Sequence, residues 1–302
     1  MLPEGVKVFE RGWLSANNIL FTGGERTALV DSGYWTHEEQ TVGLVEAGLV
    51  GRPLDLLLST HLHSDHCGGN AALQRRYPGV QTRVPPGLAQ YVRDWNPVAL
   101  TYAPTGQYCP QFHIDDVLGP GTQVVLGQDS WEVHAAPGHD PHSVILFEPK
   151  SRTLISADAL WRNGFGIVFQ ELEGERAFDE VAATLDVIES LEPELVIPGH
   201  GSVFNEVPDA LSNARRRLDS FVKDPVRHAA HAAKVLLKFK LLEWQRTPEA
   251  TLVRWAGATP YFEIVRARYF ADRDAAQWLE ELVDQLVRSG AARREREWVV
   301  NS

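Results

Sequence analysis

Short runs of apolar residues, separated by turn-forming residues, occupy the first two hundred positions of the chain. Nine runs have the length and composition of β-strands, and they cover residues 19–22, 27–30, 54–59, 80–84, 123–126, 130–134, 143–147, 153–156 and 195–197. Gly23 and Gly24 separate the first two runs, as in a hairpin turn. Apolar residues at helical spacing predict helices over residues 70–77 and 178–191. This mixture predicts an α/β protein in which helices cover sheets.

The pattern changes twice along the chain. Residues 85–121 hold six prolines, several aromatic residues and little periodicity, which predicts a long structured loop or lid rather than a domain. From about residue 213 the apolar spacing becomes helical, with helices predicted over residues 214–222, 225–244, 247–257, 261–272 and 273–290. A charged turn and a short apolar strand follow Gly290. We therefore expect one domain over residues 1–212 and a small helical domain over residues 213–302, whose outline resembles a winged helix.

Composition and charge restrict the class of protein. The 302 residues are 44% hydrophobic and 23% charged, which excludes collagen-like and disordered chains. Residues 215–302 carry 17 Lys and Arg against 12 Asp and Glu, which leaves 12 against 28 for residues 1–214. The acidic first part disfavours a broad nucleic-acid surface there, whereas the basic part leaves that option open. Two cysteines cannot form a disulfide framework, and no export signal or membrane-spanning run is evident, so we expect a cytoplasmic protein.

The chemistry is concentrated in the segment His61-Leu62-His63-Ser64-Asp65-His66, directly after the apolar run at residues 54–59. Three imidazoles and a carboxylate within six residues are difficult to explain as packing, because each buried polar side chain needs its own partner. A metal ion supplies that partner, and neutral imidazoles and carboxylates suit divalent ions such as zinc. Further ligand-type residues follow later strand runs after small-residue turns, namely His139, Asp158 and His200.

This arrangement resembles the metallo-β-lactamase superfamily, in which an H-x-H-x-D-H motif is followed by His, Asp and His on later strand-end loops. The resemblance covers about residues 15–205 and implies an αββα sandwich. It assigns one metal to His61, His63 and His139, and a second metal to Asp65, His66 and His200, with Asp158 bridging the two. Asp31 matches the family's aspartate behind the metal histidines, which orients their rings.

The resemblance also implies a mechanism. Two divalent metals, which we expect to be zinc although iron and manganese accept the same ligands, would lower the pKa of a shared water from about 15.7 towards about 7. The resulting metal-bridging hydroxide would attack an electrophilic carbonyl or phosphorus. Asp65 would orient the water and take part in proton transfer, so we assign catalytic roles to Asp65 and Asp31.

Other polar residues have ordinary structural interpretations. Cys67 beside Gly68 is expected to be a small buried filler, and His142 to be exposed. The run Arg215-Arg216-Arg217 could contact phosphates, but such runs usually form a solvated helix face. Trp161, Phe165 and Phe169 could line an apolar substrate pocket or belong to the core. No second ligand accompanies His37, His113, His134, His228 or His231.

Three functions remain open. The bridging Asp158 and the missing export signal disfavour a secreted zinc β-lactamase, and His63 disfavours the oxygen-reducing di-iron relatives. The resemblance is to the glyoxalase II-like group and its lactamase-beta-2-like branch, which predicts hydrolysis of a small thioester or ester, without membrane association. The alternatives are a metal-dependent phosphodiesterase or endoribonuclease, and a winged-helix DNA-binding regulator. For the last, the predicted helix 261–272 offers few base-reading side chains; its domain could instead cover the active site or form a homodimer interface.

Overall fold

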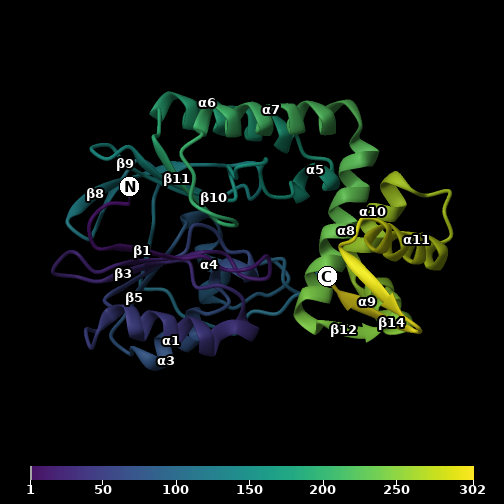
Figure 1. Cartoon of the computed structure of the whole chain (residues 1–302), viewed down its shortest axis with the longest axis horizontal. Coiled ribbons are helices and arrows are strands. Elements are labelled where there is room, and N and C mark those ends of the chain that lie inside the picture. Colours follow the sequence, from purple (N-terminus) through teal and green to yellow (C-terminus); the bar gives the residue numbers. More distant parts are fainter. Residues whose placement is uncertain (1) are drawn as a thin grey trace.

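Two sheets pack face to face in the computed structural model, which describes residues 2–302 (Figure 1). The six-stranded sheet has the order β1 (Val6–Phe9), β2 (Asn18–Phe21), β3 (Ala28–Val30), β4 (Leu56–Leu58), β5 (Gln81–Val84), β6 (Asp116–Val117). The five-stranded sheet has the order β11 (Leu195–Pro198), β10 (Thr153–Ala157), β9 (Val144–Glu148), β8 (Asp129–Ala135), β7 (Gln123–Leu126). Both sheets are mixed, since β3 to β6 pair in parallel, as do β10 and β11, and the other pairs are antiparallel.

Helices cover the outer face of each sheet (Figure 1). Helices α1 (Glu38–Leu49) and α3 (Asn70–Arg76) lie on the six-stranded sheet, and α6 (Ala177–Leu191) and α7 (Val207–Lys223) lie on the five-stranded sheet. Strand β2 shows how the layers form, because successive strand residues point to opposite faces. Ile19 and Phe21 join the core between the sheets, whereas Leu20 joins the core under α1. The predicted αββα sandwich is confirmed.

Apart from α7, which begins seven residues before the predicted helix at residues 214–222, the predicted strands and helices agree with the observed ones to within a few residues. The turn at Gly23 and Gly24 connects the antiparallel strands β2 and β3, as predicted. Strand β1 and helix α1 were not predicted. Helix α1 contains Gly43 and Gly48, which lower its intrinsic helix propensity. Gly48 is needed there, because a Cβ atom at this position would lie 2.3 Å from Leu20 Cδ2.

The proline-rich segment 85–121 is a long connection with little regular structure. It contains a 3-10 turn η2 (Pro86–Leu88), helix α4 (Ala89–Arg93) and the edge strand β6. Tyr102 and Phe112 are buried in a local core, whereas Tyr91 and Tyr108 are 42% and 54% exposed. The segment is therefore ordered by its own apolar residues, as expected for a structured loop.

Helices and a small sheet make up the C-terminal part. Its elements are α8 (Pro225–Trp244), β12 (Arg246–Pro248), α9 (Glu249–Ala258), α10 (Pro260–Tyr269), α11 (Ala275–Arg288), β13 (Ala292–Glu295) and β14 (Trp298–Asn301). The strands pair in the order β12, β14, β13. These elements share a hydrophobic core that also includes two residues from the first part of the chain. Leu172 lies in the short helix α5 (Phe169–Glu173), and Ile167 lies just before it.

The predicted domain boundary after residue 212 falls inside α7, which begins at Val207 rather than at the expected Ala214. Residues along the whole of α7, from Val207 to Phe221, pack in the core of the five-stranded sheet. A boundary between α7 and α8, near Asp224, agrees better with this packing. The division of the chain into two domains itself stays a prediction.

Candidate metal centre

The seven predicted metal ligands lie together at the ends of four strands. The segment after β4, which includes the short helix α2 (Ser64–Cys67), carries four of them; the others follow β8, β10 and β11. Three sets of ligand atoms each lie within 4.8 Å of one another: His61, His63 and His139; His61, His66 and Asp158; and Asp65, His66 and His200. The structure thus brings together residues that are up to 139 positions apart in the sequence, from His61 to His200.

Glycines make this close approach possible. A Cβ atom at Gly69 would lie 2.4 Å from Ser32 O, and one at Gly68 would lie 2.5 Å from Ser64 O. At the other side of the centre, a Cβ atom at Gly199 would lie 2.2 Å from Asp158 Oδ1. Contacts this short do not occur between non-bonded atoms, so larger residues would displace the loops that carry the ligands.

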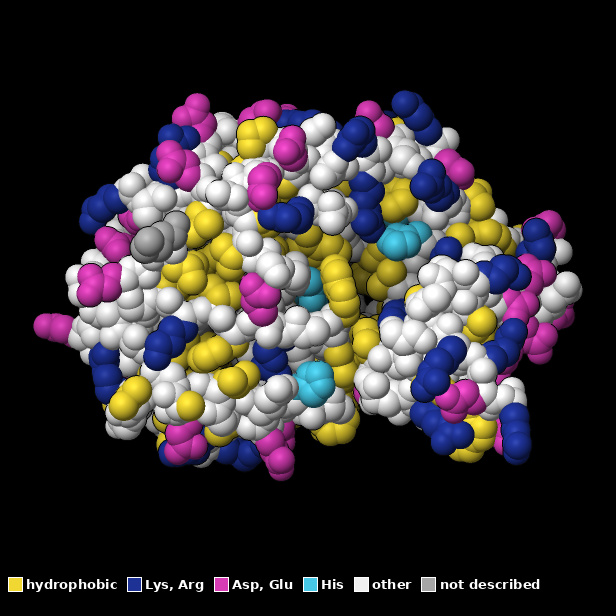
Figure 2. Space-filling model, in the orientation of Figure 1, with side chains coloured by type: hydrophobic (Ala, Val, Ile, Leu, Met, Phe, Trp, Pro, Cys, Tyr) yellow, Lys and Arg dark blue, Asp and Glu magenta, His cyan; other side chains and the backbone are white. Residues whose placement is uncertain are grey.

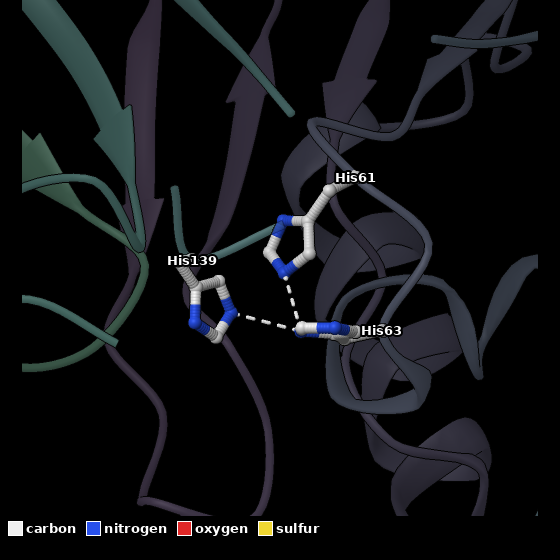
Figure 3. A group of neighbouring side chains, drawn as sticks. All are labelled: His61, His63 and His139. Carbon is white, nitrogen blue, oxygen red and sulfur yellow. Dashed lines mark hydrogen bonds between the residues drawn. The ribbon is translucent and has the colours of Figure 1, made fainter. Parts of the chain in front are cut away.

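His61, His63 and His139 form the first group, and their rings converge on one point (Figure 3). His61 Nε2 lies 3.1 Å from His63 Nδ1, which lies 2.8 Å from His139 Nε2. The far nitrogen of His139, Nδ1, is 2.6 Å from the carbonyl oxygen of Ile167. A carbonyl only accepts, so Nδ1 carries the proton and Nε2 presents a lone pair to the other two rings.

Asp65, His66 and His200 form the second group, and Asp158 lies between the two groups. His200 Nε2 is 3.2 Å from Asp65 Oδ2. Asp158 Oδ1 lies 3.4 Å from His66 Nε2 and Asp158 Oδ2 lies 3.4 Å from His139 Nε2. One carboxylate therefore faces a histidine of each group, which is the geometry that the bridging role requires.

Asp31 lies behind His66 and accepts three hydrogen bonds. Its Oδ2 lies 2.8 Å from His66 Nδ1 and 2.8 Å from Thr60 Oγ1, and its Oδ1 accepts from Thr60 N at 2.8 Å. Because a carboxylate only accepts, one proton of His66 is held on Nδ1, and Nε2, which faces Asp158, is the ring atom available to a second proton or to a metal ion. Asp31 does not touch the cavity, so it is a positioning residue rather than a catalytic one. Thr60, which also contacts His61 Nδ1 at 3.2 Å, was not predicted from the sequence.

Burial and neighbouring charges set the protonation of these groups. Burial, with the nearby histidines, lowers the pKa of His61 well below its usual value and lowers the pKa of His139 to about 4, so both rings are neutral at pH 7. Burial also disfavours a charged His66, but Asp158 and Asp31 outweigh it and raise the pKa of His66 well above its usual value. Burial opposes ionisation of Asp158, yet His66 and His200 lower its pKa well below the usual range. Asp158 is thus an anion among imidazoles, and the site favours positive charge.

The donor set fits divalent cations. The Nε2 atoms of His61 and His139 present lone pairs, and the buried Nε2 of His66, which faces Asp158, has no hydrogen-bond partner. Nitrogen lone pairs and carboxylates packed this closely repel one another unless a proton or a metal ion lies between them. The His/Asp clusters are therefore consistent with a dinuclear metal site.

A cavity opens onto this centre, and its far wall comes from α8. Val235, Leu236 and Phe239 of α8 face His63, Asp65 and His200 across it, and the loop residues Thr101, Thr105 and Gln107 line its side. Figure 2 shows the corresponding hollow between the two halves of the molecule, with histidine side chains on both sides. The C-terminal part thus completes the wall of the cavity.

Aromatic side chains surround the second group of ligands. Trp161 and Phe169 line the cavity, as the sequence allowed, whereas Phe165 is buried in the core. Trp161 Nε1 donates to Asp158 Oδ1 at 3.2 Å. Trp13, which no sequence pattern indicated, stacks on His200 with ring centroids 5.4 Å apart and remains 58% exposed.

Two predictions outside the ligand set are settled by burial. Cys67 is fully buried, with its Sγ 3.9 Å from Cys109 Sγ, as expected of a small filler. His142 is exposed, as expected.

A family profile described as the metallo-beta-lactamase superfamily matches residues 11–200. The chain belongs to this superfamily. The matched segment contains all seven predicted ligands, so the His/Asp metal-binding cluster lies within the part of the chain that the superfamily profile covers.

The curated relatives of the protein include hydroxyacylglutathione hydrolases and a beta-lactamase-like protein 2 homolog. A hydroxyacylglutathione hydrolase from Brucella anthropi is 25% identical over 179 residues, which is 57% of this chain and 55% of the relative. A beta-lactamase-like protein 2 homolog from Drosophila melanogaster is 28% identical over 200 residues, covering 63% of this chain and 60% of the relative. The matches therefore span little more than half the length of these relatives.

A solved structure supports the fold over the whole chain. The beta-lactamase domain protein from Burkholderia ambifaria is 20% identical, with a TM-score of 0.59, and the match covers 100% of this chain and 94% of the other. No helix within residues 2–302 combines the length and apolar character needed to cross a membrane.

Proposed function

We propose that the protein hydrolyses a small thioester or ester at a dinuclear zinc centre. One observation carries the proposal: the seven His and Asp ligands lie beside a cavity whose wall is aromatic and aliphatic. Trp161, Ile167, Phe169 and three residues of α8 form this wall. An apolar wall of this kind accommodates an acyl group better than a polyanionic backbone. The name of the relative from Brucella anthropi, a hydroxyacylglutathione hydrolase, agrees with a thioester substrate.

The residues of the centre have different roles in the proposed reaction. When bound, two divalent metals would supply a water of lowered pKa and polarise the scissile carbonyl. Asp65, whose carboxylate borders the cavity and lies 3.2 Å from His200 Nε2, is placed to hold a proton during the reaction. Trp161 and Asp31 act through other groups, because the first donates to Asp158 and the second orients His66.

The C-terminal part is, in this proposal, a winged-helix-like unit that serves as scaffold. A DNA-reading role is disfavoured by the contacts of α10, because Arg266 pairs with Glu263 at 2.8 Å and Arg268 donates to the carbonyl oxygen of Glu173. Tyr261 at the start of α10 donates to Phe169 O at 2.8 Å, which attaches this helix to the cavity wall. The helix therefore faces the rest of the protein rather than a groove of DNA.

The test is the initial rate of metal-loaded protein on a glutathione thioester, an acyl-CoA, a simple lactone, a cephalosporin and a single-stranded RNA, each with a chelator control. Chelator-sensitive turnover of the thioesters alone is expected. Turnover of the RNA alone would contradict the proposal and favour the phosphodiesterase alternative.

A variant adds a test of the metal centre itself. Asp158→Ala removes the carboxylate that faces both ligand groups, and we expect it to bind markedly less metal and to lose most of the hydrolysis. Asp115→Ala, which removes an exposed acid outside the centre, is the matched control. Full metal content and full activity in Asp158→Ala would refute the bridging role.

A further inference from the structure

A second cavity, with a volume of about 630 Å³, adjoins the cavity at the metal centre. Both cavities are lined by the predicted metal ligand His63, by Phe169 and by the loop residues Thr101 and Thr105. The ring centroids of His63 and Phe169 lie 6.1 Å apart. A molecule whose reacting group lies at the metal centre can therefore extend past His63 into the second cavity.

Helices α5 and α10 run side by side along the second cavity. At their beginnings, the ring centroids of Phe169 and Tyr261 lie 5.1 Å apart. At their ends, Arg268 Nη1 donates to the carbonyl oxygen of Glu173 at 3.0 Å. Tyr261, Ile264 and Arg268 line the cavity from positions i, i+3 and i+7 of α10, which lie on one face of a helix. The second cavity thus leads away from the metal centre along α10.

The wall of the second cavity is apolar, and it changes from buried to exposed along its length. Leu172 and Tyr261 are 0% and 2% exposed, whereas Ile264 and Val98 are 41% and 63% exposed. Two exposed aliphatic side chains that border one cavity form the kind of surface that an apolar ligand covers.

The second cavity has no excess of charge that would attract an ionic group. Apart from His63, the charged side chains that line it, among residues 2–302, are one acid, Glu173, and one base, Arg268. Both are exposed residues, and they lie at the end of the cavity that is far from the metal centre. Burial of an unpaired charge between the apolar walls would be costly. An uncharged ligand therefore fits this cavity better than an ion.

The length of the second cavity suits an alkyl chain. From Tyr261 to Arg268, α10 rises by about 10 Å. An extended alkyl chain advances by somewhat less than its carbon–carbon bond length of about 1.5 Å per carbon. About eight carbons therefore lie alongside α10, and the carbons between the metal centre and Tyr261 come in addition.

We propose that the second cavity binds the alkyl chain of the acyl group, so that the substrate is a thioester or ester of a fatty acid with about ten to twelve carbons. This inference rests on the proposed function, which places the scissile carbonyl at the metal centre. It replaces the unspecified acyl group of that proposal by an alkyl chain, which passes His63 and Phe169 and then follows α10. The leaving group stays in the first cavity.

Two thioesters of one neutral thiol test this inference. S-acetyl- and S-dodecanoyl-N-acetylcysteamine differ only in the acyl chain, and kcat/KM of the metal-loaded protein is measured below the critical micelle concentration of each. Each buried CH2 group contributes about fourfold to binding. Burial of three or four such groups predicts that the dodecanoyl thioester is favoured about a hundredfold or more. Equal values of kcat/KM for the two thioesters would overturn the inference.

Two variants test whether the second cavity holds the alkyl chain. Ala267→Trp fills the cavity from an exposed position of α10, and Ile264→Asn makes part of its wall polar. Val226→Asn, which changes a valine of α8 that is 47% exposed and lines neither cavity, is the matched control. For the dodecanoyl thioester, we expect kcat/KM to fall about tenfold or more in Ala267→Trp and about fourfold in Ile264→Asn. The acetyl thioester should keep its wild-type value in all three variants.

Two results of the variant experiment would overturn the inference. One is a wild-type value of kcat/KM for the dodecanoyl thioester in both cavity variants, which would place the alkyl chain elsewhere. The other is an equal loss for both thioesters, which would show that the variants act on the fold or the metal centre rather than on the alkyl chain.

Binding of free fatty acids separates this inference from the proposed function. Dodecanoate and acetate contain no scissile bond, so their affinities for the metal-loaded protein, measured by calorimetry, do not depend on hydrolysis. We expect wild type and Val226→Asn to bind dodecanoate about a hundredfold more tightly than acetate, and Ala267→Trp to lose most of this difference. That result without any thioester turnover would refute the proposed function but keep the alkyl-chain site. Equal affinities of the two acids, or a preference for dodecanoate that Ala267→Trp leaves unchanged, would overturn the inference.

Discussion

Asp31→Asn is the substitution that tests the geometry of the metal centre most directly. Asparagine has the shape of aspartate and tolerates the left-handed backbone conformation found here, with φ of +58°. One amide atom still accepts from Thr60 N, but the other becomes an NH2 group opposite His66 Nδ1. Two donors cannot face each other, so the proton of His66 moves to Nε2, the atom that faces Asp158.

The expected loss is in metal affinity at the second ligand group. Partners that orient a metal-binding histidine change affinity by about 10- to 100-fold, or about 1.4 to 2.8 kcal/mol. Because His66 is the only ligand that Asp31 contacts directly, and His61 is reached only through Thr60, the group of His61, His63 and His139 should keep its metal. Equilibrium dialysis against a competing chelator, with the bound zinc measured by mass spectrometry, should show one tight equivalent retained and one weakened.

Asp115→Asn is the control for this experiment, since Asp115 is exposed and its carboxylate accepts from Thr82 N instead. Two equivalents bound by Asp31→Asn with wild-type affinity would refute the assignment of the His66 tautomer. A loss of both equivalents together with a lost circular dichroism signal would indicate unfolding. The matching variant Thr60→Val, which leaves the Asp31 carboxylate in place, would then decide whether the hydrogen bonds or the fold failed.

Two further predictions follow from the same structure. Gly199→Ala should weaken metal binding and hydrolysis by about tenfold or more, because the new methyl group displaces Asp158 Oδ1; Gly12→Ala, where a Cβ meets nothing within 4 Å, should leave metal content and rate unchanged. Burial, with His231 and Arg217, lowers the pKa of His228 to about 3, so the folded ring stays neutral while the unfolded ring, with a pKa of about 6.5, takes up a proton. Stability is therefore present above pH 6.5 and is lost as the pH falls, by about 2 kcal/mol between pH 7.5 and 5.0 for this residue. In urea unfolding, the free energy of unfolding of the wild type should fall by about 2 kcal/mol more than that of His228→Gln between pH 7.5 and 5.0. The control His113→Gln, which changes an exposed histidine, should lose as much stability as the wild type. An equal loss in all three proteins would contradict the pKa shift of His228.

Much of the metal centre could be predicted because its signals are local. The strands before His61, Asp158 and His200 are short apolar runs, and a strand that ends in small residues presents the next side chain at the edge of its sheet. The dense His and Asp motif at residues 61–66 has few structural explanations besides metal binding. Helix α1 was not predicted, because Gly43 and Gly48 weaken the local helical pattern, and the packing that explains Gly48 is visible only in the tertiary structure.

The sequence by itself determined the layers of the sandwich, the ligand set and the glycines that admit the ligands, because periodicity and short motifs express local constraints. Only the tertiary structure decided which histidine Asp31 orients, which further groups hold the ligands and what closes the cavity. Asp31 meets His66 across 35 positions, Val235 and Phe239 come from a helix far beyond the motif, and Arg217 loses its ordinary solvent contacts by packing against α8. Such contacts join residues that share no local pattern, and burial and charge balance are properties of the assembled neighbourhood rather than of any one segment.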